Sequence, residues 1–178
     1  INFLLMQVFI ILLSFSGRHP SRFRHCHYPP RLLKVNFLLM VIIMTAEYTV
    51  VESVPSVEDF CRLRSISGLS ARPPEAAKVG LPRSCYGVHI LWQGVPVGMG
   101  RIVGDGALNF EIVDIAVDPA HQGRGLGRLI MESIIHWLDR HAYKGAYVSL
   151  VADVPALYAK FGFELVRPES EGMARVWG

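Results

Sequence analysis

The chain has 178 residues, enough for one domain with a hydrophobic core, and a formal net charge of +3. Residues 1–43 hold five of the 18 basic residues and none of the 15 acidic ones, so the remainder carries 13 basic against 15 acidic residues, which argues against a nucleic-acid-binding domain. The three widely spaced cysteines form no C-x-x-C pair, which excludes a disulfide framework or a cysteine-rich zinc site and favours buried, reduced thiols.

Two apolar runs, residues 2–15 and 35–44, flank a basic stretch at the start of the chain. Each run is shorter than the roughly 18–20 apolar residues that span a bilayer, and the basic residues follow the first run instead of preceding it as in a signal peptide. The segment 1–43 is therefore either a membrane-associating leader that meets anionic lipid or an extension outside the native domain. We favour the second interpretation, because the chain starts at Ile1 and "MTAEYTVVES" from Met44 is typical of a natural beginning. We expect residues 44–178 to form a single domain.

Strand and helix patterns alternate after this segment. The predicted elements are a strand at 48–53, helices at 56–68 and 73–80, strands at 85–92, 95–104 and 109–117, a long helix at 125–141, a strand at 146–152, a short helix at 155–161, and closing strands at 163–166 and 173–177. Residues 109–117 are apolar apart from two carboxylates, as in a strand covered on both faces. The order predicts a mixed α/β (α+β) layer fold, in which a strand, a turn and the long helix place a ligand at the carboxyl end of that strand.

The turn before the long helix, "HQGRGLG" at residues 121–127, is rich in glycine. It lacks the lysine of a Walker loop, and its glycines are spaced one residue too closely for a dinucleotide fingerprint. Glycines permit positive φ, and the free N–H groups and dipole of a helix N-terminus attract an anion. Gln122, Arg124 and Arg128 add side-chain donors, so the turn suits a pyrophosphate. The alternative is a tight turn whose glycines serve packing alone.

Two motifs together identify a family resemblance. "VDPAHQGRGLG" resembles the cofactor motif [RQ]-x-x-G-x-[GA] of the GNAT superfamily of N-acetyltransferases, with Gln122, Gly125 and Gly127 at its fixed positions. "LYAKFGFEL" at 157–165 is similar to the Y-x-K-x-G-F segment of the same family. The resemblance covers roughly residues 48–177.

The resemblance implies acetyl-CoA as co-substrate. It implies a mostly antiparallel sheet of six to seven strands, splayed at its central parallel strands and flanked by helices on both faces. The strand backbone at Ile115, Ala116 and Val117 would line the pantetheine arm. The pyrophosphate would be held by Gln122, Gly123, Arg124, Gly125, Leu126, Gly127 and Arg128.

Glu111 and Asp114 are the candidates for the general base that deprotonates the amine. They differ by three positions, so we expect them on opposite faces of a regular strand. "EIVDIAV" resembles histone-type members, whose base lies at the Glu111 position, and hexosamine-phosphate members, which carry an acidic residue at the Asp114 position. Either carboxylate could instead pair with an arginine or cap a turn.

Tyr158 resembles the family tyrosine that protonates the departing thiolate, although a core tyrosine with a satisfied hydroxyl is the alternative. The family helix before it is longer and carries an Asn, whereas here Pro155 lies three residues before Tyr158 and no Asn is present. We expect His121 to face solvent. His136 and His141 are expected at the surface or in packing, and no spacing of His and carboxylates predicts a metal site.

The sequence predicts an acetyl-CoA-dependent N-acetyltransferase that acts on a small amine or a lysine-like side chain in a ternary complex. We expect a cytoplasmic monomer or homodimer without nucleic-acid or membrane partners. Acceptor specificity is assigned to residues 62–84, to the hairpin turn at Gln93 and Gly94, and to the end of the chain after Arg167. The arginines of residues 62–84 hint at a carboxylate or phosphate on the substrate. The alternatives are a non-catalytic acyl-CoA-binding module of the same fold and a membrane-tethered acetyltransferase.

Overall fold

The computed structural model describes residues 47–176 and contains a five-stranded sheet in the order β1-β2-β3-β4-β5. The strands are β1 (Tyr48–Val51), β2 (Tyr86–Trp92), β3 (Val95–Gly104), β4 (Asn109–Val117) and β5 (Tyr147–Leu150). Neighbouring strands from β1 to β4 are antiparallel, and β4 pairs with β5 in parallel. The predicted mixed, mostly antiparallel sheet is confirmed.

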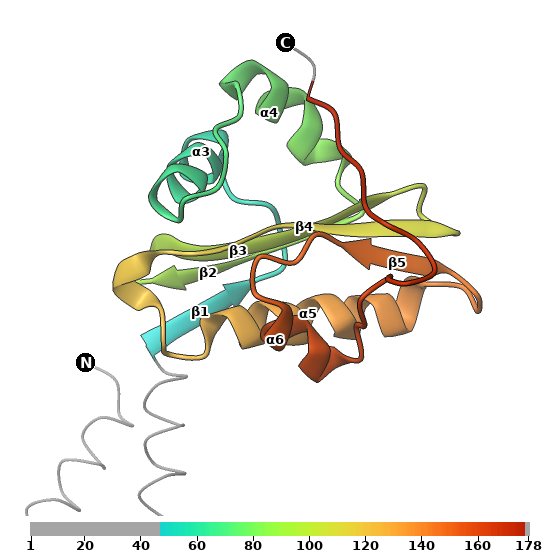
Figure 1. Ribbon diagram of the computed structural model, residues 1–178. Helices are drawn as coiled ribbons and strands as arrows, with labels where there is room; N and C mark the ends of the chain where they lie inside the picture. Colours follow the sequence, from blue (N-terminus) through green and yellow to red (C-terminus); the bar gives the residue numbers. More distant parts are fainter. Residues whose placement is uncertain (1–46, 177–178) are drawn as a thin grey trace, which may run out of the picture. The chain divides into compact units, whose positions relative to one another are not determined.

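Helices cover both faces of this sheet, as predicted (Figure 1). One face carries α3 (Val57–Ile66), α4 (Pro74–Gly80) and the short turn η1 (Leu81–Arg83); the other carries α5 (Leu126–His141), α6 (Pro155–Tyr158) and η3 (Ala159–Phe161). The residues that predicted helix starts stand at the starts of α3 and α4. The side chain of Ser56 caps α3 by accepting a hydrogen bond from the Asp59 N–H, and Pro74 occupies the first turn of α4.

Two glycines of β3 allow α5 to lie close against the sheet. A Cβ atom at Gly100 would stand 2.6 Å from Cδ1 of Ile115 and 2.6 Å from Cγ2 of Ile130, and one at Gly98 would stand 3.2 Å from Cδ1 of Ile130. Ile130 and Ile134 of α5 are fully buried in the core on this face. The close contact holds α5 firmly and thereby fixes the position of its N-terminal end.

The prediction of two closing strands was wrong for the described part of the chain. Residues 163–166 and 173–176 form no strand, so the sheet has five strands among residues 47–176 instead of six or seven. A strand needs a neighbour for its N–H and C=O groups. This segment instead turns at Val166, whose carbonyl accepts from the Ser170 N–H, and forms no ladder with β5 (Figure 1). Leu165 and Met173 are 76% and 98% exposed, so their apolar pattern is not used for packing.

The extension at 1–43 and Met44 lie outside the described residues. Among the residues that the structure describes, none of the helices is long and apolar enough to cross a membrane. Cys61 and Cys85 are free thiols, as expected, but each is only partly buried.

Candidate active site

A bulge in β4 determines where its two carboxylates point. Arg101 of β3 pairs with Val113, and Met99, two residues earlier, pairs with Ala116, so β4 contains one extra residue at this place. Asp114 occupies the bulge with a φ of 58°, in the left-handed region. The bulge reverses the alternation of side chains along the rest of β4.

Glu111 and Asp114 therefore lie on the same face of the sheet, and the expectation of opposite faces was wrong. Phe110 and Ile112 pack in the core on the α5 side, which puts Glu111 on the side of α3. Asp114 also points to this side, because its carboxylate contacts Arg64 of α3. A regular strand would have directed Asp114 towards α5.

Asp114 is neutralised by two arginines. One carboxylate oxygen accepts from Arg64 and the other from Arg101, and only 8% of the Asp114 side chain is exposed. Arg64 is equally buried and also donates from Nε to the Ser70 carbonyl at 2.8 Å. Both oxygens of Asp114 are thus occupied, and the pair joins α3 to the sheet.

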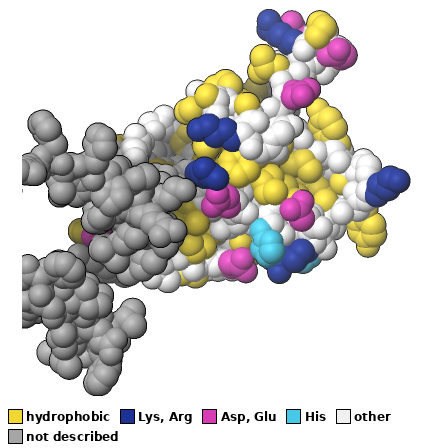
Figure 2. Space-filling view, turned by 90° about the horizontal axis from the view of Figure 1, so that it is seen from below, with side chains coloured by type: hydrophobic (Ala, Val, Ile, Leu, Met, Phe, Trp, Pro, Cys, Tyr) yellow, Lys and Arg dark blue, Asp and Glu magenta, His cyan; other side chains and the backbone are white. Residues whose placement is uncertain are grey.

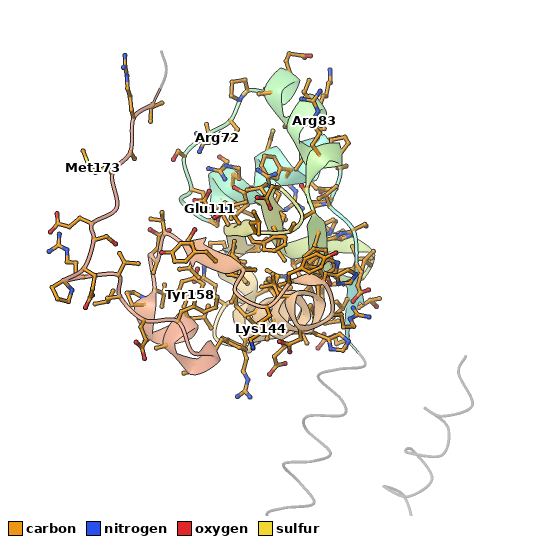
Figure 3. The ribbon with its side chains drawn as sticks, turned by 90° about the vertical axis from the view of Figure 1, so that its right-hand side faces the viewer. Arg72, Arg83, Glu111, Lys144, Tyr158 and Met173 are labelled. Carbon is orange, nitrogen blue, oxygen red and sulfur yellow. The ribbon has the colours of Figure 1, made fainter. Side chains whose placement is uncertain are left out.

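Glu111 has the opposite surroundings. Its side chain is exposed and forms no hydrogen bond or ion pair with any described residue. Figure 3 shows it on the α3 side of the sheet. Of the two sequence candidates, Glu111 alone presents a carboxylate that can accept a proton from a ligand.

Glu111 stands where β4 and β5 part. It pairs with Ser149, but the ladder ends one residue later at Ile112 and Leu150, while β4 continues to Val117. Residues 113–117 therefore have no ladder partner on this side among the described residues. The ladder stops because β5 ends at Leu150, and Ile115, Ala116 and Val117 all lie on the open stretch of β4, whose backbone can pair with an extended ligand.

The glycine turn follows this open edge. Gly123 and Gly125 have φ of 72° and 82°, which glycine adopts without strain. Gly125 is the N-cap of α5, and no side chain caps the helix there, so the N–H groups of its first turn are free for a ligand. The 16-residue helix directs its positive end at the same place. The turn can therefore bind an anion.

The side chains around the turn are already engaged. Gln122 donates from Nε2 to the Val117 carbonyl at 3.0 Å, and Arg128 pairs with Glu132 at 2.8 Å. Arg124 donates from Nη1 to the Tyr48 hydroxyl at 3.1 Å. Gln122 thereby ties the turn to the end of β4, whereas each arginine keeps further N–H donors for a ligand. The side chain of Leu126 is buried, which leaves its backbone N–H as its only contribution to the turn.

His121 does not face solvent, contrary to expectation. It is 8% exposed, and its Nδ1 lies 2.9 Å from the Tyr48 hydroxyl. The ring of Trp92 lies 4.9 Å from the imidazole, centroid to centroid. The short turn η2 (Pro119–His121) directs the ring inward onto β1 and β2, which a motif position alone does not reveal.

Tyr158 has a buried ring and an unpaired hydroxyl. The residue is 8% exposed, yet no described group forms a hydrogen bond with its oxygen, and that oxygen is not sealed from solvent. Burial raises the pKa of Tyr158, and the charge of Asp153 raises it further. The side chain packs on the α5 side, opposite Glu111 (Figure 3). The expected alternative of a satisfied hydroxyl does not hold.

The helix that carries Tyr158 is short, as expected: α6 has four residues and continues into η3. It still reaches the turn, because Leu157 lies 3.6 Å from where a Cβ atom at Gly127 would stand. Tyr158 and the glycine turn therefore belong to the same end of the sheet.

A cavity of about 1230 Å³ lies beside this site, along the outer edge of β5. It is bordered by α5, α6, Tyr158 and the segment 163–166, and none of the turn residues 122–128 lines it. Figure 2 shows apolar side chains gathered on this side of the molecule. The cavity occupies the place that a further strand next to β5 would fill.

Metal ligands are not gathered in the described part of the chain, which contains no group of three or more His, Cys, Asp or Glu side chains able to hold an ion. His136 and His141 are exposed on α5, as expected, and His141 stacks on Trp137 with ring centroids 4.3 Å apart.

Comparison with known families agrees with this geometry. Residues 50–163, well over half of the chain, match the model of the Acetyltransferase (GNAT) family. The chain belongs to the GNAT family. This GNAT protein is an acetyl-CoA-dependent N-acetyltransferase.

Relatives and solved structures support the assignment. The chain is 30% identical to serotonin N-acetyltransferase 2, chloroplastic, of Oryza sativa over 143 residues, 69% of this chain and 70% of the relative. It is 37% identical to GCN5-related N-acetyltransferase 2, chloroplastic, of Arabidopsis thaliana, but there it spans only 30% of the relative's length.

A Staphylococcus aureus protein of unknown function, described as a probable acetyltransferase, superposes with a TM-score of 0.70 at 42% identity, over 73% of this chain and 99% of that one. The ribosomal-protein-S18-alanine N-acetyltransferase of Escherichia coli, at 19% identity and a TM-score of 0.54 over 66% of this chain and 77% of that one, shares the fold.

Proposed function

We propose that this GNAT enzyme transfers the acetyl group of acetyl-CoA directly to a primary amine of a small molecule or a lysine-like side chain, with Glu111 as the general base. One observation carries the proposal: Glu111 is an unpaired carboxylate at the point where β4 and β5 part, whereas both oxygens of Asp114 are held by arginines. Asp114, our second candidate, is then a residue that holds α3 to the sheet.

A base is needed because alkyl ammonium groups titrate near pH 10, at about 10.4 for lysine, and only the neutral amine attacks a thioester. Glu111 faces the α3 side, so the acceptor amine enters from that face. The carbonyl oxygen that becomes negative during transfer is stabilised by an N–H of the open β4 edge.

The turn and the open edge are the proposed coenzyme A site. Free N–H groups at residues 123–128 bind the pyrophosphate, with Arg124 and Arg128 adding donors, and Ile115, Ala116 and Val117 line the pantetheine arm. No step requires a metal in this scheme. Tyr158 is the proposed acid for the departing thiolate, since its hydroxyl is unpaired and burial keeps it protonated.

Direct transfer is preferred to a covalent acyl-enzyme. An acyl-enzyme would need a reactive thiol such as Cys85, whose sulfur forms one hydrogen bond with a described group, to the Gly104 carbonyl at 3.6 Å. A catalytic thiol needs a neighbouring base or cation to become a thiolate. The described surroundings of Cys85 provide neither.

The acceptor is proposed to carry a carboxylate or phosphate group. Of the four arginines of residues 62–84, Arg62 and Arg64 are engaged with protein groups, but the guanidinium groups of Arg72 and Arg83 have no described partner. Figure 3 shows both on the same side of the sheet as Glu111. Burial lowers the pKa of Arg64, the charge of Asp114 raises it in part, and the charge of Arg72 lowers it, which puts Arg72 near the C-terminal end of α3. Guanidinium groups bind carboxylates and phosphates in a bidentate manner.

Thiol release from acetyl-CoA, measured with a panel of amines with and without an acidic group, tests this function. We expect turnover with at least one amine and a preference for the acidic members. Coenzyme A binding without turnover for any amine would contradict it and favour the non-catalytic module, which the single-turn helix α6 keeps as an alternative.

The place of action stays a prediction. We expect a cytoplasmic monomer or homodimer, while the rice and Arabidopsis relatives are named chloroplastic. Fluorescence microscopy of the full chain and size-exclusion chromatography with light scattering would determine both properties.

A further inference from the structure

We propose that Tyr48 and His121 are positioning residues of the coenzyme A site, acting through Arg124. A chain of two hydrogen bonds runs from His121 through Tyr48 to Arg124 and holds the guanidinium against the glycine turn. The remaining N–H groups of Arg124 then donate to the pyrophosphate. This inference rests on the proposed function of the turn.

Tyr48 brings the first strand to the turn, 76 residues away in sequence. Its oxygen lies 2.9 Å from Nδ1 of His121 and 3.1 Å from Nη1 of Arg124. Tyr48 and His121 are each only 8% exposed, so the bond between them is buried, whereas the bond from the exposed Arg124 is partly buried. Trp92, which pairs with Tyr48 in the sheet, covers the imidazole, and the Glu47 carboxylate accepts from its indole N–H at 3.0 Å.

Donors and acceptors can match along the whole chain of hydrogen bonds. A guanidinium only donates, so the Tyr48 oxygen accepts from Arg124. We assign the hydroxyl proton of Tyr48 to the bond with His121, so that Nδ1 is the acceptor and the ring proton lies on Nε2. The arrangement satisfies every buried polar atom of the three side chains.

Arg124 needs such an anchor because of its neighbours. It stands between Gly123 and Gly125, both in the left-handed region, where the backbone has little steric restraint. Apart from Tyr48, the one described group that its guanidinium reaches is the Ala120 carbonyl, at 3.5 Å. An arginine side chain without a partner loses conformational entropy when it binds a ligand, whereas a side chain already held by a hydrogen bond is preorganised. The hydroxyl of Tyr48 supplies this order before the ligand arrives.

The test compares two acetyl donors. S-acetyl-pantetheine lacks the pyrophosphate, so a residue that acts through the phosphate site affects acetyl-CoA alone. For Tyr48→Phe we expect the Kd of coenzyme A and the KM of acetyl-CoA to rise about tenfold, as for a lost hydrogen bond to a charged group, with kcat/KM for S-acetyl-pantetheine unchanged. Tyr143→Phe, on an exposed tyrosine, is the matched control and should change neither. An equal loss with both donors, or no loss with either, would overturn the inference.

A double-mutant cycle tests whether Tyr48 acts through Arg124. In an Arg124→Gln background, Tyr48→Phe should cause no further loss of coenzyme A affinity; independent, multiplicative losses would overturn the inference. His121→Gln keeps an acceptor for the hydroxyl and should bind coenzyme A nearly as the wild type, whereas His121→Leu should bind about tenfold more weakly. Equal affinities for these two variants would contradict the role of His121. A wild-type protein that binds no coenzyme A would instead refute the proposed function itself.

Discussion

Asp114 of β4 and Arg64 of α3 form an ion pair in which neither side chain is more than 8% exposed. The pair exists because the bulge turns Asp114 to the α3 face, and Arg101 completes it from β3. It separates the roles of two carboxylates that stand three residues apart. Asp114 holds the helix layer over the sheet, and Glu111 is left unpaired on the same face.

The first prediction concerns stability. Asp114→Asn leaves two arginine charges uncompensated, one of them buried, and should lower the free energy of unfolding by about 3 kcal/mol. Urea unfolding followed by circular dichroism measures this loss, with Asp139→Asn on the exposed side of α5 as the control. If Asp114→Asn melted like the wild type but lost its activity, Asp114 would be the base.

The second prediction concerns catalysis. Glu111→Gln should lower kcat by about 10²–10⁴-fold, the usual contribution of a general base, and leave the melting temperature unchanged because Glu111 has no protein partner. Steady-state kinetics at saturating acetyl-CoA measures it, with Glu58→Gln on exposed α3 as the control. A wild-type kcat in Glu111→Gln would remove Glu111 from the site.

Local signals in the sequence were enough for most of the fold and for the turn. Pro74, Ser56 and the glycines mark helix starts and turns whose chemistry is local, and the strand–turn–helix order places Gly125 at the end of β4. The bulge could not be predicted from the sequence. The alternation of side chains assumes a regular strand with a repeat of two residues, and nothing in "EIVDIAV" indicates a positive φ at Asp114. The inward turn of His121 is likewise decided by Tyr48, a residue far away in sequence.

The predicted closing strands show the other limit of a local pattern. Residues 163–166 alternate in a way that suits a strand, but an edge must be available to pair with it, and the chain passes β5 without pairing. Strand patterns describe a pleated, half-buried surface, and only the packing of the whole chain decides whether that surface exists.

The third prediction concerns Tyr158. Tyr158→Phe should lower kcat at pH 7–9 by about tenfold to a hundredfold, toward the lower end of proton-transfer effects, with the amine KM unchanged. Because burial raises the pKa of Tyr158, the phenol stays protonated above its usual range, near pH 10. Deprotonation of Tyr158 should therefore not lower the kcat of the wild type below about pH 10. The pH profile of kcat, measured for the wild type and for Tyr158→Phe, tests this prediction. A wild-type profile in the variant would contradict the role of Tyr158 as the acid.

The fourth prediction concerns stability at high pH. Burial, and then the charge of Glu52, raise the pKa of Tyr86 to about 12. Since the folded-state pKa lies above the unfolded value of about 10, the stabilisation is complete below about pH 10 and is lost as the pH rises through about 12. Between these values the wild type should lose stability more steeply than Tyr86→Phe. Chemical unfolding at a series of pH values measures it, and parallel curves would contradict the prediction.

The fifth prediction concerns the contact between β3 and α5. Gly100→Ala places a methyl group 2.6 Å from side-chain atoms of Ile115 and Ile130. Overpacking should cost about 1–3 kcal/mol of stability, and the displaced N-terminus of α5 should weaken coenzyme A binding. Gly80→Ala, where a Cβ atom meets nothing within 4 Å, is the control and should behave as the wild type. Thermal unfolding and titration calorimetry measure the two effects. Wild-type stability and coenzyme A affinity in Gly100→Ala would contradict the close packing of α5 on β3.

A crystal structure with coenzyme A bound tests the central claim most directly. The pyrophosphate should accept hydrogen bonds from the N–H groups of residues 123–128, with the pantetheine arm along residues 115–117 and its sulfur between Glu111 and Tyr158. Coenzyme A seated in the cavity at the outer edge of β5, with the glycine turn left free, would contradict the account.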